Sequence, residues 1–334
     1  MDPAVLLQSK GDDSPSGENL EYDPTFTEME LAAQPGEERQ VGDEVLAGSD
    51  PDYSEVQSKA LEVLERSHDL RAAVFLGDAI LHSEGLTGFA DVTAYIRGCL
   101  EQYWDTCHPE LDEDDGDPTM RINAVQDLCG QPDGMGGPSP VYRSLRRTAL
   151  SESRGFGRFS LRDIEIAEGL MTAPASMDTV PDPATVNAAF RDSDDAVLAA
   201  RLAAAKSAAE DVQAISDVFD LNTPGYGPKL DELVKLLQQI AKRLADYAGA
   251  PEGDEVAQDA GAPADAPADA PVARGGGAPG AINSPSDVSN TIDRIIAYYQ
   301  RNEPSSPIPI LLERAKRLVN ADFLTIMADM APAG

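Results

Sequence analysis

The chain has 334 residues and a formal net charge of −33, because 59 Asp and Glu residues face only 26 Lys and Arg. This charge excludes strong binding to nucleic acid or to an anionic membrane surface, since both need clustered basic residues. The sequence has no apolar run long enough to span a membrane, and its start lacks the pattern of a signal peptide. We therefore expect a cytoplasmic protein without membrane insertion, whose partners are proteins.

Helical patterns dominate the first 130 residues. Apolar side chains recur at helical spacing over 54–67, 69–85 and 88–108, and none of these segments has an internal proline. A fourth helix is predicted over 118–130, where the opening proline and the closing glycine suit the two ends of a helix. This series predicts a helical bundle.

The sequence changes character after the Gly-rich turn at 130–140. Residues 141–150 alternate less like a helix, and we expect them to pair with the RFSL part of 157–169 as a small β-hairpin. Long helical patterns return over 182–221 and 227–249, which we expect to pack as a helical hairpin. We interpret residues 1–180 as one domain and 181–249 as its helical-hairpin extension.

Residues 250–281 contain Pro, Ala, Asp and Gly with almost no large apolar side chain, which predicts a disordered linker. Residues 282–334 then show three short helical patterns rich in Leu, Ile and Met. So small a unit without Cys or His is marginal alone, and self-association is the expected solution, with an intramolecular core as the alternative. The predicted fold class is mainly α, a helical bundle followed by a flexible linker and a small helical oligomerisation domain.

The stretch WDTCHPELDEDDGD, residues 104–117, is the best candidate for a metal or catalytic site. Aligning Gly116 with the glycine of a calcium loop places Leu111 and Ile122 at ligand positions, so the match fails. Cys99, Cys107 and His108 lack paired zinc-ligand spacing, and no Walker, zinc-peptidase or nucleophile-elbow motif is present. We predict no enzyme, no metal and no cofactor. A metal-dependent hydrolase remains an alternative that elemental analysis would test.

A structural interpretation of this stretch is more economical. One helix ends near its start, the residue before a proline is disfavoured in helical geometry, and the carboxylates precede the next helix, whose dipole favours them. We expect Arg121 to pair with Asp114 or Asp115, and the isolated His68 and His82 to lie on helix surfaces or partly buried. The residues predicted to build this helix-to-helix corner are Trp104, His108, Pro109, Asp114, Asp115 and Arg121.

Several segments together resemble a known family. They are SGENLEYDPTF (16–26), HDLRAAVFLGDAIL (68–81), YWDTCHPELDEDDGDPTMRINA (103–124), GRFSLRDIEIAEG (157–169) and the tail YYQRNEPSSPIPILLERAKRLVNADFLTIMADMAP (298–332). In this combination the chain resembles the TssA family of type VI secretion components, whose amino-terminal region is the ImpA N-terminal domain. Both ends match in order across an unmatched linker, which makes the resemblance more specific than any single motif.

The resemblance implies a non-enzymatic assembly factor that acts at the baseplate or distal end while the tail tube and sheath polymerise. It also implies a homo-oligomeric ring formed by the tail, with baseplate, tube and sheath proteins as further partners near the membrane-docked apparatus. We expect Glu303 and Arg314 to fix the helix-helix angle that sets ring geometry. The predicted oligomer interface comprises Val288, Ile292, Ile295, Tyr299, Glu303, Leu311, Leu312, Arg314, Leu318 and Phe323.

A second hypothesis rests on the acidic residues at the start of the chain. Residues 1–55 contain fifteen Asp and Glu against two basic residues, whereas residues 282–334 contain six acids against five bases. The protein would then be an acidic adaptor or chaperone that binds a basic partner. Such binding should weaken steeply with ionic strength, whereas an apolar ring should not.

Overall fold

The computed structural model describes residues 1–247, except 37, 38, 42, 43, 47, 175, 176 and 178, and five positions further along the chain. The chain divides into two compact units, Met1–Asp254 and Glu255–Gly334. The predicted linker at 250–281 lies outside the described residues, as does most of 282–334. The five described positions of the second unit, all helical, are Ile292, Ile296, Ile308, Leu312 and Lys316.

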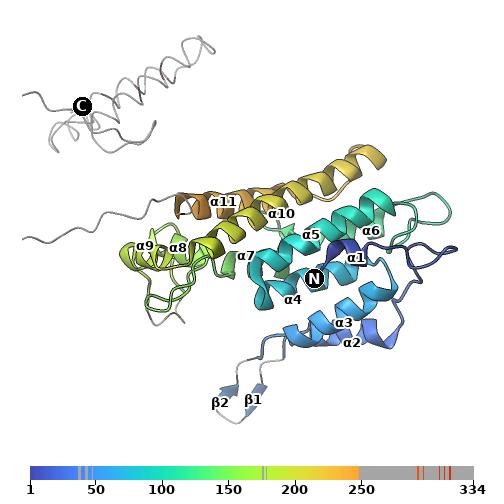
Figure 1. Cartoon of the computed structure of the whole chain (residues 1–334), viewed down its shortest axis with the longest axis horizontal. Helices are drawn as coiled ribbons and strands as arrows, with labels where there is room; N and C mark the ends of the chain where they lie inside the picture. Colours follow the sequence, from blue (N-terminus) through green and yellow to red (C-terminus); the bar gives the residue numbers. More distant parts are fainter. Residues whose placement is uncertain are drawn as a thin grey trace, which may run out of the picture. The chain divides into compact units, whose positions relative to one another are not determined.

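The first unit is built mainly from α-helices (Figure 1). None of the described helices is both long enough and apolar enough to cross a bilayer. The helices are α1 (Pro3–Leu6), α2 (Pro24–Ala32), α3 (Tyr53–Arg66), α4 (Leu70–Ser83), α5 (Gly85–Gln102), α6 (Thr119–Gln126), α7 (Pro140–Arg147), α8 (Leu161–Ala167), α9 (Pro183–Arg191), α10 (Asp195–Asn222) and α11 (Asp231–Tyr247). The strands are β1 (Arg39–Val41), β2 (Glu44–Leu46), β3 (Gly130–Gln131) and β4 (Gly137–Pro138).

Short polar side chains start many of these helices. Asp23 accepts a hydrogen bond from the Thr25 amide, 2.9 Å away, just before the proline that opens α2. The hydroxyl of Ser160 accepts from the Asp163 amide, and the Asp163 carboxylate accepts from the Ser160 amide, which forms a capping box for α8. Such caps satisfy amides that have no partner inside the helix. Helix starts are therefore set locally by the sequence.

The core lies where α3, α4 and α5 pack in series and α10 runs along α5 (Figure 1). The apolar face predicted for the first helix is buried in α3, with Val56, Ala60, Val63 and Leu64 at most 2% exposed. Helix α5 contacts α1, α4 and α10, so it is covered on several sides. A helix in this position buries apolar residues around much of its circumference.

Helix α10 packs against α5 and carries one buried carboxylate. Asp211, only 6% exposed, accepts hydrogen bonds from the Arg97 guanidinium and the Thr93 hydroxyl of α5, both at 3.3 Å. Helix α11 packs against α10, as the predicted helical hairpin requires. The buried alanines of α10 are Ala204, Ala205, Ala208 and Ala209.

The described strands form two short antiparallel pairs, β1 with β2 and β3 with β4. Neither lies where we predicted the hairpin. Residues 140–147 form α7, because Ser139 accepts a hydrogen bond from the Tyr142 amide at 3.0 Å and a proline occupies the first helical position. Of β-structure, the described residues of the two predicted strand segments form only an isolated bridge between Ala149 and Ser160.

Candidate functional site

The acidic part of the 104–117 stretch is an exposed loop, whereas the residues before it are buried. Cys107, His108 and Pro109 lie in the interior, and Asp114 and Asp115 face solvent. Carboxylates within the loop accept hydrogen bonds from amides two residues ahead, as in turns that Asp favours. The last of these bonds, from the Thr119 amide to Asp117, leads into α6. The Thr119 side chain and, after it, this amide lower the pKa of the Asp117 carboxyl.

Arg121 has no exposed surface and is among the largest fully buried side chains of the described residues. The predicted pairing with Asp114 or Asp115 is wrong. Its guanidinium donates to the carbonyl oxygens of Cys107 at 2.6 Å and Pro109 at 2.8 Å, and also to that of Trp104. These carbonyls belong to non-helical backbone and, because they are buried, they need hydrogen-bond donors. The Arg121 guanidinium supplies these donors and therefore does not pair with the exposed carboxylates.

Trp104 connects this corner to α10. Its ring meets that of Phe219 edge to face, with the centroids 5.2 Å apart and the planes at 79°. The Trp104 ring also contacts Arg121, whose guanidinium carbon lies 5.1 Å from the indole centroid. Edge-to-face rings and a cation over a ring are both favourable arrangements. The corner is thereby held against the long helical hairpin.

His68 and His108 are also interior residues, which corrects the expectation that His68 lies at a helix surface or only partly buried. The His68 ring is fully buried, 2.9 Å from the Tyr95 hydroxyl through Nδ1, and its burial lowers its pKa to about 4. The His108 ring contacts the Gly17 carbonyl at 3.2 Å through Nε2. Within the described residues, His68 Nε2 and His108 Nδ1 have no hydrogen-bond partner.

Backbone bonds join three distant segments at this point. The His68 amide donates to the Ser16 carbonyl at 2.7 Å, and the His108 amide donates to the His68 carbonyl at 2.9 Å. The Leu70 amide in turn donates to the His108 carbonyl at 2.8 Å. Ser16, His68 and His108 lie in the three N-terminal stretches on which the family resemblance rests, so these stretches meet at one structural junction.

The described part of the chain holds no group of three or more His, Cys, Asp or Glu side chains placed to bind a metal ion. Burial raises the pKa of Cys107 to about 11 and that of Cys99 still further. Both thiols therefore stay protonated near neutral pH and are poor nucleophiles. The contacts of residues 104–117 fix the backbone between α5 and α6 and pack the Trp104 ring.

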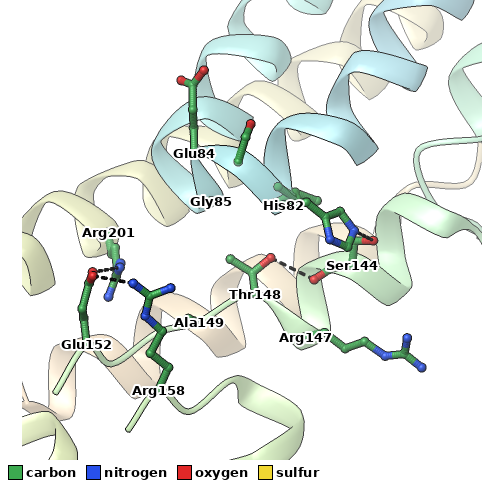
Figure 2. Close-up of a pocket in the computed structure, with 12 residues that line it drawn as sticks. His82, Glu84, Gly85, Ser144, Arg147, Thr148, Ala149, Glu152, Arg158 and Arg201 are labelled. Carbon is green, nitrogen blue, oxygen red and sulfur yellow. Dashed lines mark hydrogen bonds and ion pairs between the residues drawn. The ribbon is translucent and has the colours of Figure 1, made fainter. Parts of the chain in front are cut away.

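A separate hollow of about 400 Å³ lies where the end of α4, α7 and α10 come together (Figure 2). Glu152 accepts hydrogen bonds there from Arg158 at 2.9 Å and Arg201 at 2.7 Å. The bond and charge of Arg201, followed by the charge of Arg158, lower the pKa of Glu152. The lining residues are Leu81, His82, Ser83, Glu84, Gly85, Ser144, Arg147, Thr148, Ala149, Glu152, Arg158 and Arg201.

A serine, a histidine and an aspartate lie together beside this hollow, namely Ser144, His82 and Asp78. Their hydrogen bonds do not connect them in the sequence that activates a serine nucleophile. The Ser144 hydroxyl donates to the Asp78 carboxylate at 2.6 Å, and His82 Nε2 lies 3.1 Å from the same hydroxyl oxygen. A catalytic serine must give its proton to the histidine, which the acid then supports. Here the proton points to the acid and the imidazole stacks on the Tyr53 ring at 3.6 Å, so the group serves packing.

The predicted oligomer interface falls mostly outside the described residues. Ile292 and Leu312 are described, and both are helical and half-buried. The members outside the described residues are Val288, Ile295, Tyr299, Glu303, Leu311, Arg314, Leu318 and Phe323.

Comparison with known proteins places this architecture in a family. Residues 8–130 match the family "ImpA, N-terminal, type VI secretion system". The chain is 39% identical over 341 residues to the type VI secretion system component TssA1 of Pseudomonas aeruginosa, covering 100% of this chain and 96% of that protein. A solved structure, the N-terminal domain including the conserved ImpA_N region of the TssA component from Burkholderia cenocepacia, shares the fold with a TM-score of 0.57 at 23% identity, covering 74% and 93% of the two chains. The chain therefore belongs to the TssA family of type VI secretion system components.

Proposed function

We propose that the protein is a non-enzymatic scaffold of the type VI secretion system, and that residues 282–334 assemble it into a homo-oligomeric ring. One observation carries the proposal, namely the relation to the secretion component TssA1 across the whole chain. The C-terminal residues are included in that relation, so the proposal assigns them a role within the same apparatus. The ring would support tail tube and sheath assembly at the baseplate or distal end, on the cytoplasmic side.

The few described residues of the second unit support an apolar packing face. Ile292 and Ile296 are both helical and four residues apart, as are Ile308 and Leu312, and this spacing places each pair on one face of a helix. Ile296 is 7% exposed. A unit of this size gains stability when such faces are covered by other copies.

Ring formation would make weak contacts effective. A ring displays one N-terminal unit per subunit, and linking several binding modules raises their effective concentration at a multivalent target. Baseplate, tube and sheath structures repeat their subunits, so they are suitable targets for such a scaffold. Individual contacts between the N-terminal unit and a partner then need only moderate affinity.

Light scattering and electron microscopy of the full-length protein test the ring. We expect a uniform closed assembly, and we expect Ile295→Asp combined with Leu318→Asp to reduce it to a monomer with the N-terminal unit still folded. Leu221→Asp is the control, because Leu221 is 81% exposed in the first unit. A monomeric native protein would refute the ring.

Two further measurements separate the finer claims. If Glu303→Ala and Arg314→Ala both leave the symmetry of the particle unchanged, these two residues do not set ring geometry. If partner binding instead requires residues 1–55 and weakens steeply with salt, the acidic adaptor replaces the scaffold as the function of the protein.

A further inference from the structure

Arginines gather in one short part of this strongly acidic chain. Between Ser139 and Arg162 there are six arginines and a single acidic residue, Glu152, although the whole chain carries a net charge of −33. The segment includes α7, the loops that follow it and the start of α8. Its arginines are Arg143, Arg146, Arg147, Arg154, Arg158 and Arg162.

Three of these arginines, Arg147, Arg154 and Arg158, line two of three neighbouring hollows. The hollow of about 400 Å³ in Figure 2 shares Glu152 and Arg158 with a second of about 550 Å³, and the second shares Asp192 with a third of about 570 Å³. We call these three neighbouring hollows together the arginine groove. It is defined by Arg147, Arg154, Arg158, Arg191 and Arg201, contributed by α7, α9, α10 and the loop between α7 and α8.

Some arginines of the groove form ion pairs and others do not. Glu152 is held by both Arg158 and Arg201, whereas Arg147, Arg154 and Arg191 make no ion pair with any described residue. The acidic groups along the groove have other partners. Asp192 accepts from the Ser153 hydroxyl, Asp194 accepts from the first amides of α10, and Glu84 accepts from the Gln57 amide. Arg147, Arg154 and Arg191 are therefore the guanidinium groups of the groove that are not held in an ion pair with a described residue, although Asp192 and Asp194 keep their negative charges nearby.

An exposed aromatic side chain stands beside these guanidinium groups. Phe156 is 48% exposed and borders the third hollow together with Arg191. Its loop is fixed, because the Ser153 and Gly157 backbones bond each other in both directions at 3.2 Å, and the Phe156 amide donates to the Ser153 hydroxyl at 2.9 Å. That hydroxyl donates in turn to Asp192 at 2.6 Å, which ties the loop to the end of α9.

We propose that the arginine groove and Phe156 form a docking surface for a segment of a partner protein in which carboxylates flank an apolar side chain. Arginine binds carboxylates with two parallel hydrogen bonds, and arginine and aromatic residues are enriched among the residues that dominate binding energy at protein interfaces. The fixed loop presents Phe156 with little further ordering on binding. This docking does not require residues 282–334 to form a ring.

The charge of the whole chain selects an acidic protein segment over nucleic acid, which also offers anionic groups. A phosphate backbone would have to approach a molecule whose long-range field is strongly repulsive. A peptide can place a few carboxylates into the groove and keep its remaining surface neutral. Complementary charge of this local kind sets partner choice and register.

Site-specific photocrosslinking tests the proposal in the full-length protein, inside cells that assemble the secretion apparatus. Phe156→p-benzoylphenylalanine places the photoreactive group in the groove, and Tyr22→p-benzoylphenylalanine is the matched control, since Tyr22 is a 92% exposed aromatic residue elsewhere. We expect a crosslink from position 156, absent from position 22, to a partner peptide with more Asp and Glu than Lys and Arg.

Charge reversal completes the test. Combining Arg147→Glu, Arg154→Glu and Arg191→Glu should reduce the crosslink yield by about tenfold or more, while the corresponding lysine substitutions should retain most of it. These three arginines hold no described carboxylate, and circular dichroism will show whether the variants are folded. The proposal is overturned by no crosslink, by a crosslink only to a second copy of the chain or to a non-acidic peptide, or by a yield that charge reversal leaves unchanged.

Discussion

The guanidinium of Arg121 lies over the indole of Trp104, 5.1 Å from the ring centroid, and also donates to the Trp104 backbone carbonyl. One buried cation thus holds both the ring and the backbone of the same residue. Nearby carboxylates of the loop are exposed, and none of the described ones forms an ion pair with Arg121. Carbonyl oxygens and an aromatic face therefore hold the charged Arg121 in the corner between α5 and α6, in place of a carboxylate counter-ion.

Arg121→Met should destabilise the N-terminal unit by about 2–4 kcal/mol, because the carbonyls of Cys107 and Pro109 would then be buried without donors. Methionine keeps most of the volume, so the loss reports hydrogen bonding more than cavity formation. Urea unfolding followed by circular dichroism measures the change.

Arg154→Met is the control for this substitution. Arg154 is exposed and makes no ion pair with a described residue, so its replacement should change the unfolding free energy by less than about 0.5 kcal/mol. An equal effect of the two substitutions would show that the buried carbonyls do not depend on Arg121.

Gly17→Ala should be far more destabilising than Gly116→Ala. Both glycines have a positive φ, +76° and +73°, so each alanine would carry a similar backbone strain of about 1 kcal/mol. A Cβ at residue 17 would also lie 2.1 Å from the Arg66 carbonyl oxygen, whereas a Cβ at residue 116 would meet nothing within 4 Å. Thermal unfolding of both variants compares the two costs, and equal shifts in Tm would contradict the steric argument.

Stability should fall as the pH drops from about 6.5 toward 4, in part through His68. Burial lowers the pKa of this residue to about 4 in the folded protein, while the unfolded chain binds a proton near pH 6.5. Below pH 6.5 the unfolded state therefore binds more protons, and the folded state loses on the order of 3 kcal/mol by pH 4.

His68→Asn isolates this contribution, because asparagine keeps a polar group near the Tyr95 hydroxyl but does not titrate. We expect the stability difference between the native protein and the variant to shrink or reverse as the pH falls. Urea unfolding at a series of pH values measures it. A difference that stays constant from pH 7 to pH 4 would show that His68 does not titrate in this range.

The three cysteines should react only when the first unit unfolds. Cys99, Cys107 and Cys129 are fully buried, and burial raises the pKa of each thiol, in the case of Cys129 to about 11. Thiolate is the reactive form, so both access and ionisation protect these groups. Labelling with a thiol-specific chromogenic disulfide at pH 8 should be slow without urea and stoichiometric in it. Rapid labelling of one thiol in the native protein would reveal a local opening.

Helix positions could be read from the sequence because periodicity and caps are local. The faces of α3 and α11 follow from apolar spacing alone. Helix α10 packs on α11 as expected for the predicted hairpin, but the segment predicted over 182–221 is divided into α9 and α10. Helix α7 was missed because its apolar pattern is short. The local signal that identifies it is Ser139 followed by Pro140, a cap and a proline at the first helical position.

Contacts between residues far apart in the chain could not be predicted from these local patterns. Sequence proximity suggested that Arg121 pairs with Asp114 or Asp115, but the buried carbonyls of a non-helical turn compete better for the guanidinium. The burial of His68 depends on Ser16 and His108, which are far apart in the chain. The arginine-rich segment, in contrast, is visible in the sequence as a local reversal of charge.

The buried Asp211 gives α10 a fixed axial position on α5. Sliding one helix along the other by a turn would move its side chains by about 5.4 Å and leave this carboxylate facing apolar groups without the donors of Arg97 and Thr93. The contacts of Asp211 should therefore hold the α10–α11 hairpin in register with α5.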